Sequence, residues 1–199
     1  MKTITITKTY NVFKYEELSE KAKENVKENY LTYYRDTYNF EELCKEKLKE
    51  LFRDAQLNVQ FDLSYCQGSG FNIYGKIDLS SLLEIEEIFN KFSDKEYRTI
   101  KFYLDNVYYY KLKENIRYSY CIIQDADIEE FIIDNLQENY YKNINYKLIK
   151  KFADFGKQYL INLCSDFEKI GYDYFYKVDD EEIIELDEDY LENGLIFLE

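Results

Sequence analysis

The sequence pattern that most constrains the fold is a strict alternation of apolar and polar residues that begins after residue 56. Asn, Gln, Asp and Ser lie between the apolar members of this run, and such an alternation predicts a half-buried β-strand. The apolar members are Leu57, Val59, Phe61, Leu63 and Tyr65. A glycine-bearing stretch follows, and the alternation resumes from Phe71 to Ile77. Two such runs joined by a short turn predict a β-hairpin, with the apolar residues of its first strand facing the core.

Helical spacing of apolar residues accounts for much of the remaining chain. The first predicted helix has Ser19 as its N-cap and an apolar stripe at spacings of three and four: Leu18, Ala22, Val26, Tyr30 and Tyr33. Further helices are predicted over about Phe40–Ala55, Ser81–Phe92, Asp125 or Asp127 to Asn139, and Tyr146–Lys169. We assign Leu43 and Ile170 to buried faces of these helices, and Gly171 to the end of the last one.

Other segments favour strands, and the element order decides the fold class. Strands are predicted over residues 3–9, 99–104, 107–113 and 116–123, and an aromatic strand-like piece follows residue 172. A short acidic helix near 180–186 and an Asn193-Gly194 turn close the sequence. This order lacks regular β-α alternation, so it predicts an α+β fold, an antiparallel sheet with helices packed mainly on one face. We expect one domain over residues 1–199, with the acidic segment 172–199 packed on it.

The charge balance disfavours several classes of partner. Forty acidic and 26 basic residues give a formal net charge of −14. The negative electrostatic field of such a chain repels nucleic acid and anionic membranes and attracts basic surfaces. We therefore expect no direct nucleic-acid binding, no membrane binding, and a protein partner with a basic surface.

The missing residue types narrow the chemistry further. The chain has no histidine, which removes histidine-based acid–base catalysis and histidine metal ligands. The four cysteines are far apart in sequence, so we expect reduced, mostly buried thiols, no metal and no cofactor: Cys44, Cys66, Cys121 and Cys164. Residues 1–10 lack a signal-peptide core, and we expect a cytoplasmic protein that is not an enzyme.

The hairpin turn is the first candidate binding element. It contains Gln67, Gly68, Ser69 and Gly70, whose exposed amides could hold an anion, and Cys66 could be a nucleophile. The alternative is that the glycines serve only the geometry of the turn. The structural interpretation is favoured, because glycines in turns usually serve the geometry of the backbone.

Tyrosines near residues 108–120 form the second candidate. Tyr109 and Tyr118 belong to a cluster that could stack on bases or line a protein-binding face. Cross-strand aromatic pairing within a sheet explains the same cluster without a ligand.

The acidic C-terminal segment is the third candidate. Eight of the eleven residues from 179 to 189 are acidic. The segment has no glycine where a calcium loop needs one, so it departs from the EF-hand pattern. Either it is a solvated charge run, or it is a surface that imitates nucleic-acid phosphate and binds a basic partner through its carboxylates: Asp179, Asp180, Glu181, Glu185, Asp187 and Asp189.

Three motifs resemble those of a family of small phage and mobile-element proteins. The motifs are YEELSEKAK at residues 15–23, LSYCQGSGF at 63–71, and DDEEIIE at 179–185 followed by Tyr190 and Asn193-Gly194. The family pattern has Asp where this chain has Ser69, and a histidine that the segment 117–120 lacks. Some members of the family are labelled antitoxin-like. The resemblance implies a phage or prophage origin.

The acidic field and this resemblance together predict a phage-derived protein that binds and inhibits a host protein. We expect a nucleic-acid-handling defence system, of the kind targeted by anti-CRISPR or antirestriction proteins. Two alternatives remain open at this point. One is an antitoxin-like partner of a basic toxin, and the other is a small-molecule or nucleotide-binding protein that uses the Gly68/Gly70 loop.

Overall fold

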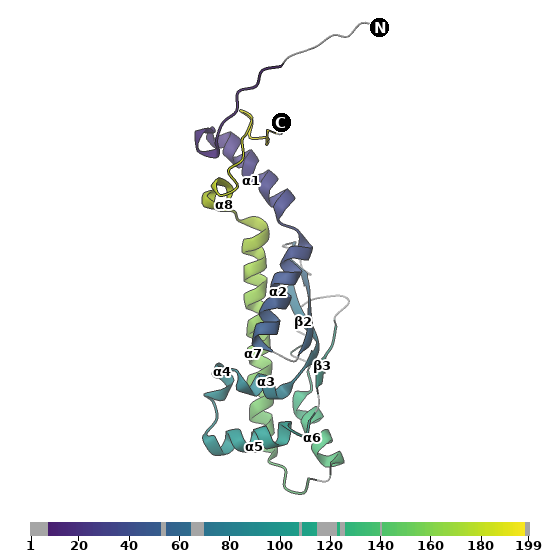
Figure 1. The fold of residues 1–199 in the computed structure, drawn as a ribbon. Coiled ribbons are helices and arrows are strands. Elements are labelled where there is room, and N and C mark those ends of the chain that lie inside the picture. Colours follow the sequence, from purple (N-terminus) through teal and green to yellow (C-terminus); the bar gives the residue numbers. More distant parts are fainter. Residues whose placement is uncertain are drawn as a thin grey trace, which may run out of the picture. The chain divides into compact units, whose positions relative to one another are not determined.

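The computed structural model describes residues 8–52, 55–64, 70–107, 109–114, 123, 126–139 and 141–197. The chain sorts into two compact units. The terminal unit comprises residues 1–39 and 172–199, and the central unit comprises residues 40–171. Helices α2 (Thr37–Leu51) and α7 (Tyr146–Tyr176) contribute residues to both units (Figure 1).

A small antiparallel sheet lies in the central unit, with strand order β1-β2-β3. The strands are β1 (Gln56–Asp62), β2 (Gly70–Ile77) and β3 (Tyr110–Leu112). Phe61 pairs with Phe71, and Val59 pairs with Ile73. The hairpin predicted from the alternating residues is therefore confirmed, and so is the α+β class.

The remaining helices are distributed over both units. The terminal unit holds a 3-10 turn, η1 (Tyr15–Glu17), and helices α1 (Glu20–Tyr34) and α8 (Asp180–Ile184). The central unit holds α3 (Leu79–Glu84), α4 (Glu86–Phe89), α5 (Asp94–Leu104) and α6 (Ile128–Glu138). The Ser19 cap is confirmed, because its hydroxyl oxygen accepts the Ala22 N–H at 3.3 Å.

Aromatic side chains join helices α2 and α7 to one face of the sheet. The Phe40 ring of α2 lies edge-on to Phe61, with centroids 5.0 Å apart, and the Phe167 ring of α7 lies 5.2 Å from Phe71. Gly171 of α7 faces the same cluster, and a β-carbon there would lie 2.3 Å from Leu63 Cδ1. The sheet and the two helices therefore share one apolar core.

The prediction that Gly171 ends the long helix is wrong, as is that of a strand-like piece after it. Helix α7 continues to Tyr176, and Gly171 lies buried inside it. The small residue is needed for the close approach of Leu63 and Phe40, not for chain reversal. An apolar stripe alone does not distinguish these two uses of glycine.

The prediction of a strand over residues 99–104 is also wrong. These residues form the second half of α5, whose Ile100, Tyr103 and Leu104 side chains are buried at helical spacing. The helix begins with a capping box in which Ser93 and Glu96 bond to each other's backbone N–H. This cap outweighs the strand preference of the β-branched and aromatic residues that follow it.

Smaller corrections concern breaks and exposure. The helix predicted over Ser81–Phe92 is split into α3 and α4 by extended backbone at Ile85. The sequence pattern predicts buried positions for Tyr33, Leu43 and Ile170, but their exposed fractions are 74%, 48% and 43%. The strands predicted over 3–9 and 116–123 lie almost wholly outside the described residues.

The terminal unit has its own small core, built from both ends of the chain. Its buried members are Tyr15, Leu18, Ala22, Val26, Ile183 and Tyr190. Phe13 and Tyr190 exchange two backbone hydrogen bonds, each 2.9 Å long. The predicted turn at Gly194 is confirmed, with a φ of +85° that favours glycine. The acidic segment is thus held against α1 and η1.

Candidate functional site

The acidic segment forms a short helix because it has capping residues at its start and an apolar residue that can be buried. The Asp179 backbone N–H donates to the Glu182 carboxylate at 3.5 Å, which starts α8. Ile183 then points into the core of the terminal unit and is 1% exposed. Asp187, with a φ of +52°, ends the turn that follows the helix. The charge run is therefore a folded surface, with each carboxylate in a definite place.

One group of these carboxylates is paired with basic residues of the same unit. Asp180 lies 2.5 Å from the Lys27 ammonium and accepts a hydrogen bond from the Tyr15 hydroxyl at 3.0 Å. The bond from Lys27 and the bond from Tyr15 lower the pKa of the Asp180 carboxyl. Burial, with the bond to Asp180, raises the pKa of Tyr15 to about 12. Asp180 is thus a stabilising contact between α8 and α1.

Glu182 forms a second pair that includes aromatic rings. Its carboxylate contacts the Arg35 guanidinium and accepts from the Tyr30 hydroxyl at 3.2 Å. The guanidinium lies over two rings, 5.2 Å from the Tyr30 centroid and 4.7 Å from that of Tyr174. Arginine suits such a position because its flat cation stacks on rings while it binds a carboxylate.

Asp187 and Asp189 share a third cation. Lys14 Nζ lies 2.9 Å from Asp187 Oδ1 and 3.0 Å from Asp189 Oδ1. It also donates to the Asp187 carbonyl at 2.9 Å. Hydrogen bonds to the two carboxylates raise the pKa of Lys14. Three basic residues of the terminal unit therefore balance four acids of the segment.

A second group of carboxylates forms no ion pair with any residue that the structure describes. We call this group the unpaired carboxylates: Asp179, Glu181, Glu185, Glu188 and Glu192. Glu181 and Glu185 are exposed and lie one helical turn apart, on the side of α8 away from Ile183. Ile184 lies between them and is 40% exposed. An apolar side chain flanked by unbalanced carboxylates suits a contact with a basic partner.

The structure separates the predicted partner-binding residues into two sets. All six predicted acids lie together in the terminal unit, where three are paired and three are not. Tyr109 is exposed but belongs to the central unit, and Tyr118 lies outside the described residues. Of the predicted hairpin loop, only Gly70 is described, as the buried first residue of β2, and Gln67, Gly68 and Ser69 lie outside the described residues.

Two exposed tyrosines were missed as candidates by the sequence analysis. Tyr33 and Tyr38 of the terminal unit are 74% and 69% exposed. Tyrosine is enriched at protein interfaces, so both are candidates for contact residues. Helical spacing could have identified Tyr38, because it lies on the side of α2 away from Phe40 and Cys44.

The described side chains offer little reactive chemistry. Burial raises the pKa of the Cys44 thiol to about 12, so it is not a thiolate at neutral pH. Among the residues that the structure describes, no three Cys, Asp or Glu side chains are arranged to hold a metal ion. No helix in this part of the chain is both long and apolar enough to cross a membrane.

Comparisons of the chain with protein-family models, with curated proteins and with solved structures found no match.

Proposed function

We propose that this protein is a non-catalytic binding protein whose acidic C-terminal surface engages a basic surface on another protein. The observation that carries the proposal is the division of the carboxylates in residues 179–192. Four of them are balanced by Lys14, Lys27 and Arg35, whereas the unpaired carboxylates have no such cation, and two of them, Glu181 and Glu185, lie on the same turn as the exposed Ile184. Paired acids hold the segment in shape, and unpaired acids keep their full charge for a partner.

The proposed partner is a host protein that handles nucleic acid, such as a CRISPR or restriction effector. A groove that binds phosphates presents Lys and Arg at short intervals, and carboxylates held on a folded surface can occupy it. The phage-like motifs described above support a setting in the host cytoplasm. The same surface could neutralise a small basic toxin, which is the antitoxin-like alternative.

The test compares two triple variants that each remove three negative charges. The first neutralises unpaired carboxylates, as Glu181→Gln, Glu185→Gln and Glu188→Gln. The second neutralises paired ones, as Asp180→Asn, Glu182→Gln and Asp187→Asn. Capture from a host lysate followed by mass spectrometry supplies the partner. Association rates are then measured with purified proteins at several ionic strengths.

We expect the unpaired-set variant to fold like the wild type and to associate at least tenfold more slowly at low salt. The wild-type rate should fall as salt rises, because screening acts first on electrostatic steering. The paired-set variant is the matched control, with the same net charge. We expect it to be less stable but to associate faster than the unpaired-set variant at a temperature where it is folded. DNA should compete with the wild-type protein for binding to the captured partner.

Two results would contradict the proposal. One is a wild-type association rate that is independent of salt and unchanged in the unpaired-set variant. The other is a partner that binds DNA and this protein simultaneously without competition. A small basic toxin as the captured partner would favour the antitoxin-like alternative at the same surface.

A further inference from the structure

A groove in the central unit has the opposite character to the acidic segment. It lies between α5 and the residues that precede α7, and it has a volume of about 840 Å³. This volume falls in the range of small-molecule sites. The groove is lined by Asp94, Lys95, Arg98, Thr99, Phe102, Tyr103, Tyr141, Lys142 and Asn143. Three cations therefore face one carboxylate, in a chain whose net charge is −14.

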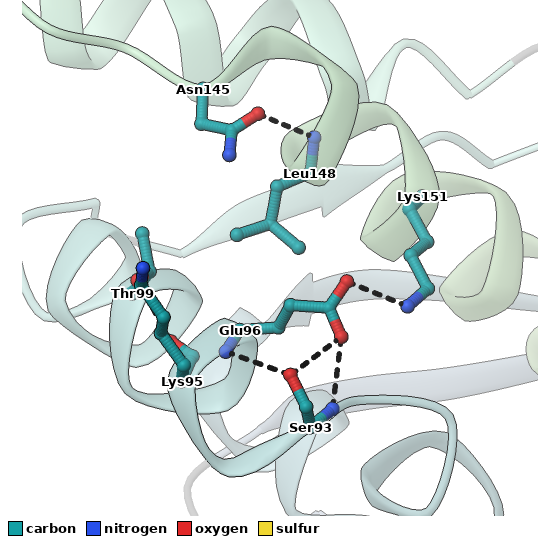
Figure 2. Close-up of polar contacts among 7 residues, drawn as sticks. All are labelled: Ser93, Lys95, Glu96, Thr99, Asn145, Leu148 and Lys151. Carbon is teal, nitrogen blue, oxygen red and sulfur yellow. Dashed lines mark hydrogen bonds and ion pairs between the residues drawn. The ribbon is translucent and has the colours of Figure 1, made fainter.

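The three cations of this groove are not neutralised by neighbouring acids. Lys95, Arg98 and Lys142 are exposed and form no ion pair with any residue that the structure describes. The adjacent lysines of α7 behave differently. Lys151 lies 2.9 Å from Glu96, which points toward it in Figure 2, and Lys150 lies within 3.6 Å of two carboxylates. Positive charge in the groove is thus available to a ligand.

The groove also has a fixed wall. The Tyr103 hydroxyl donates to the Asn143 carbonyl and accepts from the Asn145 N–H, both at 3.1 Å. These bonds hold the segment before α7 against α5. Asn145 Oδ1 in turn accepts the Leu148 N–H at 3.2 Å and caps α7 (Figure 2). Lys142 therefore directly precedes a segment that is bonded to both α5 and α7.

An aromatic pair supplies the apolar part of the groove. Phe102 is 55% exposed although it is a large apolar side chain. Its ring centroid lies 5.7 Å from that of Tyr141, with the planes at 71°. An exposed ring supported by a second ring is a suitable surface for a flat aromatic ligand to stack on.

We propose that this groove binds a nucleotide, with its phosphates on Lys95, Arg98 and Lys142 and its base on Phe102. Arginine and lysine are the usual phosphate-binding side chains, and arginine can form two parallel hydrogen bonds to one phosphate. A mononucleotide suits the groove because its single base and short run of phosphates match one exposed ring and three cations.

This inference is independent of the proposed protein-binding function, since it uses residues of the central unit alone. The first test is calorimetric titration of the full chain with AMP, ADP, ATP, adenosine and inorganic phosphate. We expect the nucleotides to bind at least tenfold more tightly than adenosine, because the cations contact the phosphates. We also expect inorganic phosphate to bind more weakly than any nucleotide, because it lacks the base.

Variants then locate the site. The triple change Lys95→Gln, Arg98→Gln and Lys142→Gln should raise the nucleotide Kd at least tenfold, and Phe102→Ala should raise it severalfold. The matched control is Lys76→Gln, Lys111→Gln and Lys113→Gln, which removes the same charge from exposed lysines of the same unit. Circular dichroism melts verify that each variant folds.

Three outcomes would overturn the proposal. They are no nucleotide binding at millimolar concentration, an equal loss in the groove and control variants, and unchanged binding in the groove variant. Binding of a single-stranded oligonucleotide without binding of any mononucleotide would also overturn it. That result would assign the groove to nucleic acid.

Discussion

The terminal and central units differ in how they use charge. The terminal unit has 17 acidic and eight basic residues among 67, a net charge of −9, whereas the central unit has 23 and 18 among 132, a net charge of −5. The acidic character of the chain is thus concentrated in about a third of its length. Whole-chain net charge therefore describes neither unit well, and it conceals the basic groove of the central unit.

The two units also differ in what stabilises them. The central unit has a large apolar core, with Phe40, Phe52 and Phe152 completely buried. The apolar core of the terminal unit has six buried members among the described residues, and tyrosine–carboxylate and cation–carboxylate contacts lie around them. In the central unit, we expect large-to-small substitutions of buried side chains to cause the largest losses in the free energy of unfolding. In the terminal unit, we expect backbone conformation and polar contacts to contribute more to that free energy.

The largest effect should come from Phe152→Ala in the central unit. Phe152 is completely buried in α7, so the change removes a whole aromatic ring and leaves a cavity. We expect a loss of about 3–5 kcal/mol in the free energy of unfolding, measured by urea titration. Phe102→Ala is the control on an exposed ring and should cost less than about 1 kcal/mol. Similar losses for both variants would show that burial does not set stability in this unit.

A smaller effect is expected from Gly194→Ala in the terminal unit. The φ of +85° is unfavourable for alanine, and the added β-carbon would lie 2.4 Å from the Ala22 carbonyl oxygen. We expect a loss of about 1–3 kcal/mol in the free energy of unfolding.

Gly156→Ala in the central unit is the control for Gly194→Ala. Its β-carbon would meet only the end of the Leu82 side chain, at 2.8 Å, and alanine gains about 1 kcal/mol in a helix interior. We expect a change near zero in the same urea titration. A larger loss at Gly156 than at Gly194 would reverse the expected contrast between the units.

The smallest effect concerns the pH dependence of Glu96. The Ser93 backbone N–H, the Lys151 ammonium and the Ser93 hydroxyl lower the pKa of Glu96 from 4.5 to about 2. A lowered folded-state pKa means that the carboxylate stabilises the fold above about pH 4.5, and that this contribution is lost as the pH falls toward 2. The melting temperature of Glu96→Gln should therefore be lower than that of the wild type at pH 6.

The gap between the two melting temperatures should close progressively between pH 4.5 and pH 2. A gap of equal size at pH 6 and pH 2.5 would mean that the ionised carboxylate does not contribute. Ser93→Ala, which removes the hydroxyl but keeps the backbone donor and Lys151, should retain part of the pH dependence.

Much of the fold could be predicted because its signals are local. The alternation across Val59 and Phe61 specifies a strand, and Ser19 specifies a helix start, whatever the rest of the chain does. Residues 99–104 were misassigned because their composition favours a strand, although the Ser93-x-x-Glu96 capping box was visible in the sequence. Gly171 was misassigned because its reason is a tertiary contact with Phe40 and Leu63.

The candidate sites were predictable only in outline. The sequence locates the carboxylates, but it does not show which are paired, because their partners are distant in the chain. Tyr15 and Asp180, for example, are 165 residues apart. The basic groove was missed for the same reason, since Arg98 and Lys142 belong to separate segments that only the fold brings together.

The joining of both ends of the chain in the terminal unit has a consequence for synthesis on the ribosome. Helix α1 is translated about 150 residues before its partners Ile183 and Tyr190. The isolated helix is only 15 residues long and is marginal in water. All residues of the central unit, 40–171, are therefore translated before the core of the terminal unit can form. A nascent chain that ends before residue 183 would lack the folded acidic surface.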